Sequence, residues 1–559
     1  MVGAGTLTRR GFVWQKIEDF SSTHVIGIIG SLLFLLLAIF VLWPLIAMLA
    51  QSIYGPEGFT LQYYAKFITK GYYYQSLYNT VKLGMIVTPL CLAITFCLAY
   101  ITTRGPSYLR KPLKVFALLP LITPSFMFAL SLILFLGRNG IITKALNLDW
   151  NIYGFHGCVI AQVLAFIPLA YLILENTMVS LNPNLEDAAD NLGATGGKIL
   201  RSITVPLLVP SLLKAALIIF AQTITAFGSI ALLRGRVPFL APDSYFMIIG
   251  EADFNMASVL SAFLILLCVV VFIMQVYFAK GKAYATIGGK PVATEPRHIS
   301  RGILIPMLIV CFITSGLILV SFGVVIAGAF TKLVGIDNAF TLNWILDSRS
   351  NPALVNSVKV ALLTGVFGGF LGVILAYTIV KGKFIGRTAL EASILAVFAF
   401  PGTALGIGYI LAFNNPPLLL TGTFMILVIN STFRTAAISV EAGITKLQQL
   451  STEIEEASWN LGAGIITTFR RTVFPIIFPA FMYGFMYSFI RTMKTLSAII
   501  FLISAGNLML AAYIFDMVNS GQLGLASAAT MKLTIIVGIT LILIQYLSKW
   551  TGLSVTRRA

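Results

Sequence analysis

Long apolar segments alternate with short polar ones along the whole chain of 559 residues. Each apolar segment has about the 20 residues that a helix needs to cross the ~30 Å hydrocarbon layer of a bilayer. In the first half they predict helices near residues 25–50, 80–101, 112–136, 157–178, 208–233 and 256–279. In the second half they predict helices near 302–330, 355–380, 388–413, 417–440, 477–504 and 526–548. The pattern therefore predicts an all-α membrane protein with about twelve transmembrane helices.

The composition supports a location in the lipid bilayer. Hydrophobic residues make up 58% of the chain and charged residues only 10%, against about 25% charged residues in an ordinary soluble domain. The first apolar segment is too long for a signal-peptide core, and no small-residue cleavage site follows it, so we expect it to be retained as a helix. The net charge of +18 does not indicate nucleic acid, because Lys and Arg gather in the cytoplasmic loops of multi-pass proteins. Their distribution predicts that both termini lie in the cytoplasm.

Cysteine and histidine patterns give no sign of a disulfide, a metal site or a catalytic centre. The five cysteines lie in or at the edge of apolar segments, no CxxC occurs, and the three histidines are scattered. A membrane enzyme would need His, Asp or Cys clustered at catalytic spacing. We therefore expect no metal site and no enzymatic activity.

A polar stretch rich in Gly, Pro and basic residues, 280–301, separates the two sets of helices. This composition is typical of a flexible tether, and we expect it to be a cytoplasmic linker. The predicted domains are therefore 1–279 and 302–559.

An internal repeat relates these two domains. Asn79-Thr80-Val81-Lys82 matches Asn356-Ser357-Val358-Lys359 at an offset of 277 residues, and Pro124 matches Pro401 at the same offset. Further along the chain the offset becomes 269, because the loop 137–157 of the first half is longer than its counterpart 414–417. Six helices in each copy give the copies one orientation, as two parallel repeats related by an axis along the membrane normal.

Each repeat carries a polar loop of the same design between its fourth and fifth helices. A short acidic and alanine-rich segment ends at Gly193 in the first repeat and at Gly462 in the second, and a proline follows thirteen residues later, at Pro206 and Pro475. Glycine can end a helix with a positive φ, and proline fits the first turn of the next helix. The loops therefore predict a short helix, a sharp turn and the start of a membrane helix.

These loops resemble the EAA loop of ABC importer permeases, a pattern of Glu-Ala-Ala followed by Gly and then Pro. The first copy, about 181–206, carries Glu186, Asp187, Ala188, Ala189, Gly193 and Pro206. The second copy, about 450–475, carries Glu455, Glu456, Ala457, Gly462 and Pro475. Asp187 replaces the consensus Glu in the first copy, and Ser458 departs from the second Ala in the other.

The resemblance implies a fused, binding-protein-dependent permease of the type I ABC importer fold, in a bacterial cytoplasmic membrane. Each loop would then dock as a coupling helix on one subunit of a separate ATPase dimer, which uses ATP and Mg, while an extracytoplasmic binding protein delivers the substrate. The chain contains no GxxxxGK[ST] motif, so we expect it to hydrolyse no ATP itself.

Polar and basic residues in the fifth helix of each repeat are candidates for the translocation pathway, because charged groups inside a bilayer usually face a cavity or a partner. They are Lys214, Thr223, Ser229, Arg491, Lys494 and Ser497. The alternative is that Lys214 and Arg491 extend to an interface or bond to neighbouring carbonyls.

The fused arrangement is similar to permeases of the ferric-iron branch, which implies ferric iron as the substrate. The same branch includes systems for thiamine, phosphonates, hexose phosphates and polyamines. Arg234, Arg236, Arg491 and Lys494 favour an anion, or iron carried with an anion, over a polycation. Arg234 and Arg236 could instead pair with acids on the binding protein.

A secondary transporter is the competing class, because it can also have twelve helices in two parallel halves. Such a carrier needs proton-relay acids in the middle of its helices, whereas Glu175 and Glu391 lie near inward ends. Two matched docking loops have no role in an ion-coupled carrier.

Overall fold

The computed structural model describes residues 25–280, 300–382, 384–451 and 453–550. This part of the chain is nearly all helix, and eleven of its helices are long and apolar enough to cross a membrane. Its strands form two small antiparallel hairpins, β1 (Tyr54–Gly55) with β2 (Gly58–Phe59) and β3 (Thr331–Leu333) with β4 (Asp337–Phe340).

The first half begins with a span over Val25–Ile53 and continues to α14. Its elements are η1 (Ala38–Leu42), α2 (Trp43–Ile53), α3 (Gln62–Thr69), α4 (Gly71–Arg104), α5 (Ser107–Leu118), η2 (Leu119–Ile122), α6 (Phe126–Leu136), α7 (Ile141–Ala145), α8 (Phe155–Ser180), α9 (Pro183–Asn191), α10 (Gly196–Ile199), η3 (Leu200–Thr204), α11 (Val205–Ile224), α12 (Gly228–Leu233), α13 (Leu240–Glu251) and α14 (Phe254–Lys280).

The second half runs from α15 to α26. Its helices are α15 (Arg301–Ala329), α16 (Asn343–Leu346), α17 (Asn351–Lys381), α18 (Arg387–Ala399), α19 (Gly402–Phe413), α20 (Phe424–Leu447), α21 (Glu453–Asn460), α22 (Ile465–Thr468), η4 (Phe469–Val473), α23 (Phe474–Lys494), α24 (Ile499–Leu502), α25 (Leu510–Asn519) and α26 (Leu523–Trp550). Residues 281–299 of the expected linker lie outside the described residues.

The two halves repeat the same series of elements. Helices α4, α8 and α11 pack together in the first half, as α17, α20 and α23 do in the second. The offset of 269 residues holds in the structure, because α22 and η4 begin 269 residues after α10 and η3. The repeat read from the sequence is therefore present in three dimensions.

One predicted helix, 388–413, is broken, which leaves eleven long spans rather than twelve. It consists of α18 and α19, separated at Phe400 and Pro401. The predicted helix 112–136 is interrupted at the equivalent place, where Thr123 adopts an extended conformation before Pro124. A proline disfavours helical geometry in the residue before it and donates no backbone hydrogen bond. The matching prolines therefore mark two equivalent breaks.

Other helix boundaries also differ from the predicted ones. The helix expected at 417–440 is α20 and lies seven residues later, and the helix expected at 477–504 ends at Lys494. After Lys494 the chain turns and forms the separate short helix α24. Apolar composition continues through such turns, so it does not locate them.

The first helix of each half packs against the other half. Helix α2 lies against α19 and α14, and α15 lies against α6, α4 and α26. The Tyr409 hydroxyl of α19 donates to the carbonyl of Phe40, and Gly408 lies so close to the Pro44 backbone that a Cβ there would collide with it. This exchange joins the two halves.

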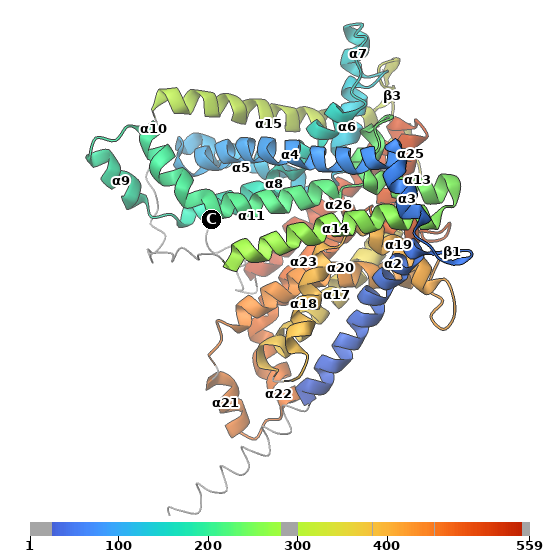
Figure 1. Ribbon diagram of the computed structural model, residues 1–559. Coiled ribbons are helices and arrows are strands. Elements are labelled where there is room, and N and C mark those ends of the chain that lie inside the picture. The colour runs from blue at the N-terminus through green and yellow to red at the C-terminus, as the bar shows by residue number, and fades with distance from the viewer. Residues whose placement is uncertain (1–24, 281–299, 383, 452, 551–559) are drawn as a thin grey trace, which may run out of the picture.

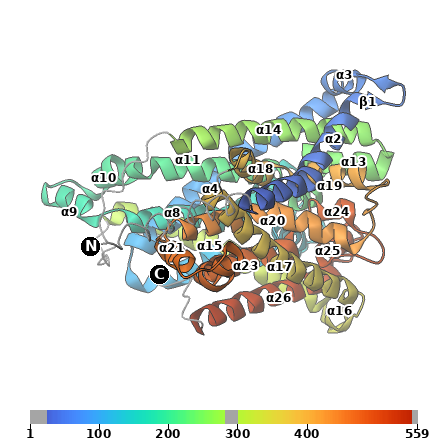
Figure 2. The same ribbon diagram turned by 90° about the horizontal axis from the view of Figure 1, so that it is seen from below.

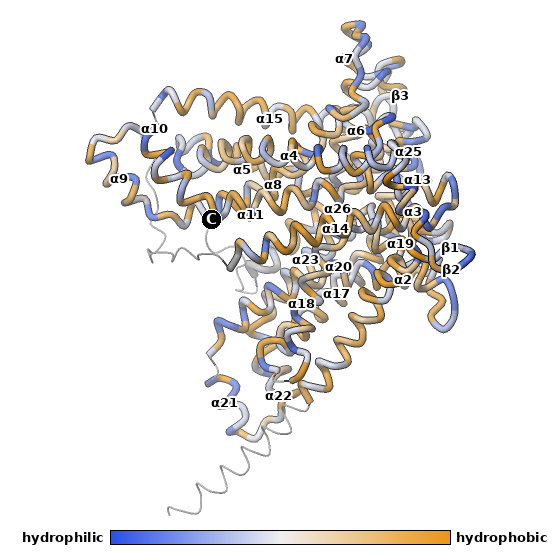
Figure 3. Tube along the Cα trace, in the orientation of Figure 1, coloured by the Kyte–Doolittle hydropathy of each residue, from blue (hydrophilic) through white to orange (hydrophobic). Residues whose placement is uncertain are grey.

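The halves converge at one end of the molecule and diverge at the other. In Figure 1, α9 and α21 lie well apart, whereas α13, α19 and α25 gather at the opposite end. Figure 2 shows the same helices from below, with α2 lying beside α19. Hydrophobic residues dominate the long helices in Figure 3, and hydrophilic ones gather around α9, α21 and the loops of the opposite end.

Candidate functional site

Helices α9 and α21 form the expected polar loops, and each ends at a glycine in the left-handed region. Gly193 has φ +80° and Gly462 has φ +81°. The Gly193 amide donates to the Asp190 carbonyl, and the Gly462 amide donates to the Trp459 carbonyl, both at 2.8 Å. An added Cβ would meet no atom within 4 Å at either glycine. Only the backbone conformation favours glycine there.

The turn is followed by a helix that starts earlier than the prolines suggest. Helix begins at Gly196 and Ile465 and runs without interruption through a wide π turn, η3 or η4, into α11 or α23. The amide of Val205 donates to the Leu200 carbonyl, five residues back. A widened turn of this kind commonly accommodates a disturbance of the normal hydrogen-bond ladder, here next to Pro206 and Pro475. Each loop is thus continuous with a membrane span.

A buried ion pair fixes α9 to the end of α4. Glu186 is 5% exposed and Arg104 is 4% exposed. Arg104 Nε donates to Glu186 Oε2 at 3.1 Å, and its Nη2 donates to the Met178 carbonyl at 3.2 Å. The other carboxylate oxygen of Glu186 accepts a bond from the Thr204 hydroxyl at 2.9 Å. The carboxylate therefore joins α9, α4 and η3.

The second half repeats this pair with a different cation. Lys381, the last residue of α17, lies 3.1 Å from Glu455 Oε2, and Glu455 is 3% exposed. Val473 occupies the position equivalent to Thr204, so the hydroxyl partner is missing. Consistent with that substitution, Glu455 Oε1 is buried without a hydrogen-bond partner among the described residues.

The outer surface of both short helices is exposed. Asp187, Ala188, Glu456 and Ala457 are all exposed, and Ala189 is half-buried. Leu192 and Leu461, at equivalent positions, are each 88% exposed. A large apolar side chain left open at the same place in both copies indicates a surface that binds a partner.

The pathway candidates of the first half do not lie together in one environment. Lys214 is exposed on α11. Thr223 is fully buried and its hydroxyl is unpaired among the described residues. Ser229 is also buried and accepts a hydrogen bond from Gln162 at 2.9 Å.

The candidates of the second half lie near one another. Arg491 is exposed, and Lys494 and Ser497 are half-buried. The Lys494 ammonium donates to the backbone carbonyl of Leu121, a residue of η2 in the first half. Sequence reasoning did not single out Arg434, whose guanidinium lies with Ser497 beside Gly402. Its position inside the predicted helix 417–440 was the available signal.

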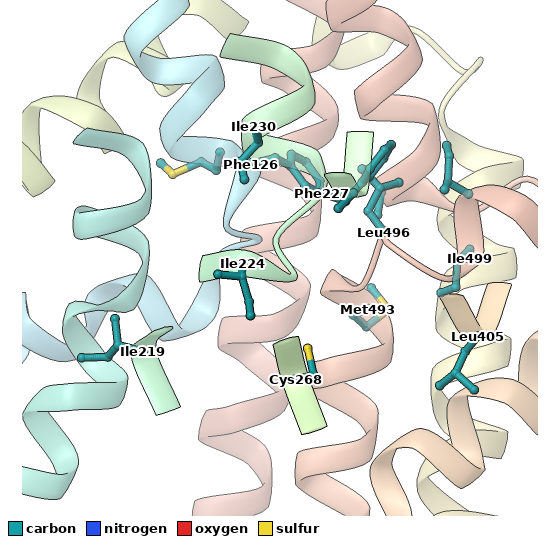
Figure 4. Packing of buried hydrophobic residues seen from close by; sticks show 14 of the residues in the cluster. Phe126, Ile219, Ile224, Phe227, Ile230, Cys268, Leu405, Met493, Leu496 and Ile499 are labelled. Atoms are coloured by element: carbon teal, nitrogen blue, oxygen red, sulfur yellow. The ribbon is translucent and has the colours of Figure 1, made fainter. Parts of the chain in front are cut away.

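Apolar side chains close the contact between the halves at the end away from α9 and α21. Figure 4 shows Phe126, Phe227 and Leu496 close together, and a Cβ on Gly228 would lie 3.0 Å from Leu496 and 3.2 Å from Phe126. The rings of Phe227 and Phe515 have centroids 5.5 Å apart. These contacts join residues of α6 and α12 to residues of the second half.

Glu175, the acid weighed for a proton relay, has a cationic partner. It is 8% exposed, and its carboxylate lies 2.9 Å from Lys114 Nζ. An ion pair of this kind ties α8 to α5. The geometry therefore gives Glu175 a structural role.

Comparisons with known proteins agree with this architecture. The model of the family "binding-protein-dependent transport system inner membrane component" matches residues 95–284 and again 368–552. A ferric transport system permease protein of Actinobacillus pleuropneumoniae is 31% identical over 90% of this chain and 75% of its own length. A putative ferric transport system permease protein of Haemophilus influenzae is 32% identical over 86% of this chain and 78% of its own.

Other matches cover less of the chain. A molybdenum transport system permease protein of Mycobacterium tuberculosis is 27% identical over 35% of this chain and 73% of its own length. A solved bacterial alginate ABC transporter in complex with its periplasmic protein matches 50% of this chain and 99% of its own, with 17% identity and a TM-score of 0.40.

Proposed function

The chain belongs to the binding-protein-dependent transport system inner membrane components, and from this premise we propose that it carries ferric iron inward. It is a multi-pass permease subunit of a binding-protein-dependent ABC importer, and such subunits are not catalytic. The observation that carries the proposed substrate is the identity of 31% and 32% to two ferric transport permeases over 90% and 86% of the chain.

In this proposal α9 and α21 lie in the cytoplasm, together with both termini. Each helix docks on one subunit of an ATPase dimer, which binds ATP and Mg. The exposed Leu192 and Leu461 support this role, because each offers an apolar anchor at the same place in the two repeats. The binding protein docks at the opposite end, where α13 and α25 lie.

Two connections would transmit movement of the ATPase into the membrane. The first is the helix that runs without a break from Gly196 to Ile224, and from Ile465 to Lys494 in the other half. The second is the buried pair of Glu186 with Arg104, or of Glu455 with Lys381. A docked coupling helix that moves therefore pulls on two spans of its own half. Closure of the ATPase dimer would rock the halves about their apolar contact and alternate access to the pathway.

Uptake by proteoliposomes tests the proposal. They contain this chain, its ATPase and its binding protein, and they receive ⁵⁵Fe(III) with and without ATP. We expect accumulation only with ATP, and only with the loaded binding protein. ATPase stimulation without iron accumulation would retain the importer and exclude iron as its substrate. Phosphonate, hexose phosphate and thiamine would then be tested in the same vesicles.

A further inference from the structure

The beginning of α19 is surrounded by groups that bind anions. This twelve-residue helix starts at Gly402, directly after Pro401, and no side chain caps its first turn. The Arg434 guanidinium and the Ser497 hydroxyl both lie against Gly402, so closely that a Cβ there would be 2.8 Å from Arg434 Nη2. The next residue, Thr403, is fully buried with an unpaired hydroxyl. A helix N-terminus attracts negative charge, and here a cation lies beside it instead.

Two further cations extend this arrangement into a cluster, which we define as Arg434, Arg491 and Lys494. Arg491 is close enough to both Arg434 and Lys494 for their charges to repel. The other charged or titratable groups acting on Arg434 are Tyr409 and Tyr487, which are neutral. Among the described residues, no carboxylate forms an ion pair with any member of the cluster.

The cluster lies deep in the membrane-spanning part of the molecule. Arg434 is near the middle of α20. Lys494 bonds to Leu121, which lies between α5 and α6, near the middle of that stretch. Both side chains are surrounded by protein, yet both keep part of their surface exposed, and Arg491 is exposed. The three cations therefore face space that solvent can reach, at a depth where unpaired charge is costly.

The first half has no such cluster, although its backbone is equivalent. Ala165, Gln222 and Thr225 occupy the positions of Arg434, Arg491 and Lys494. A requirement of the fold would apply to both halves, because the helices and the proline break are the same. The charge therefore belongs to a function that only the second half performs.

We propose that Arg434, Arg491 and Lys494, with the first turn of α19, form an oxyanion site on the translocation pathway. The shared chemistry of its ligand is a carboxylate or phosphate group, which arginines bind with paired hydrogen bonds. The bond from Lys494 to the Leu121 carbonyl crosses between the halves, so an anion that draws Lys494 toward itself alters a contact on which the pathway depends.

This inference extends the proposed function, because it states the form in which ferric iron crosses. Three positive charges without an acidic partner repel a bare Fe³⁺ ion. The same charges attract ferric iron whose carboxylate or phosphate ligands give the complex a net negative charge. The cargo that reaches this depth is therefore an anionic ferric complex.

Binding to the complete complex in nanodiscs tests the site. The probes are ³²P-labelled inorganic phosphate alone and ⁵⁵Fe-labelled ferric citrate, each at low ionic strength. We expect both to bind the wild type, and Arg434→Gln with Arg491→Gln to weaken both at least tenfold. The matched control is Lys214→Gln, which removes a cation from the equivalent helix of the first half and should change binding less than twofold.

Conservative substitution and assembly keep the result interpretable. Arg434→Lys retains the charge and should keep at least a third of the phosphate affinity, whereas loss of shape alone would affect Lys and Gln equally. ATPase stimulation by the loaded binding protein reports that each variant is folded and assembled. Equal phosphate binding by the wild type and the double variant would overturn the proposal.

The two probes separate the sources of the anion. If ferric citrate displaces phosphate, the site takes the ligands of the cargo. Phosphate binding that ferric citrate does not displace would overturn the assignment to cargo. If the wild type binds phosphate at this site but its proteoliposomes accumulate no iron, the proposed substrate fails and the site stands.

Discussion

At the level of single residues, the coupling loops are held by one buried carboxylate each, and the two copies differ in how well it is satisfied. Glu186 accepts from both Arg104 and Thr204, whereas Glu455 has only Lys381. The reason is Val473, which is 1% exposed and replaces the threonine. A buried acceptor without a partner costs about 1–3 kcal/mol.

Exchanging the two residues should therefore have opposite effects on stability. Val473→Thr supplies a hydroxyl to Glu455 Oε1 and should raise the unfolding free energy by about 0.5–1.5 kcal/mol, while Thr204→Val should lower it by about 1–3 kcal/mol. The thermal unfolding midpoint of the purified chain in detergent measures both. Equal destabilisation by the two substitutions would mean that Glu455 already has a partner.

Removing a cation from the pair should be more damaging. Arg104→Met leaves Glu186 buried without its charge partner, and a broken buried ion pair costs about 3–5 kcal/mol. Adding Glu186→Leu removes the stranded charge and should restore much of the loss in the same unfolding assay. A double variant as unstable as Arg104→Met would show that packing of the arginine, not its charge, is what matters.

At the level of elements, the sharp turn after each coupling helix should depend on backbone conformation alone. An alanine in the left-handed region costs about 1–2 kcal/mol, and nothing near Gly193 or Gly462 would collide with its Cβ. Gly193→Ala with Gly462→Ala should therefore reduce ATPase co-purification and ATP-driven uptake several-fold. Gly193→Asn with Gly462→Asn should be milder, because Asn tolerates this region.

The matched control is Gly464→Ala in the second loop. Gly464 also has no atom within 4 Å of an added Cβ, but its φ is −69°, which any residue adopts. Uptake by this variant should equal that of the wild type. Equal losses for Gly464→Ala and the two left-handed glycines would assign the effect to general loop perturbation.

The elements could be predicted from sequence where they rest on local pattern, and not where they rest on distant contacts. Gly193 and Gly462 mark the turns because a left-handed residue is a local requirement. Pro124 and Pro401 were visible as a repeat, yet an apolar run on both sides concealed that each breaks its helix. The pairing of Arg104 with Glu186 joins residues 82 apart in the chain, and no local pattern encodes such a distance.

At the level of the whole molecule, duplication accounts for what the sequence could predict. Two copies at constant offsets predict two like halves in one orientation, and the structure has them. The exchange of α2 and α15 between the halves could not be predicted, because a lipid-facing helix and one packed on a neighbouring half have the same apolar composition. The cluster around Arg434 is similarly hidden, since its members come from different helices.

The arrangement of the halves predicts how the molecule moves with its ATPase. The halves are joined by Phe227, Leu496 and Phe515 at one end, while α9 and α21 are apart at the other. Closure of an ATPase dimer on both coupling helices should therefore bring Leu192 and Leu461 closer together. Each is 88% exposed and suits a spin label after substitution by Cys.

Pulsed electron paramagnetic resonance on the Leu192→Cys/Leu461→Cys variant in the complete complex measures this distance. Four of the five native cysteines are buried, and the fifth, Cys97, is partly buried, so a Cys97→Ser background keeps labelling specific. We expect the distance to shorten when a hydrolysis-deficient ATPase binds ATP, because dimer closure draws both loops inward. A pair within one half, Leu185→Cys and Leu192→Cys, should not change. An unchanged distance between the halves would contradict rocking about the apolar contact and would place the ATP-driven movement elsewhere in the complex.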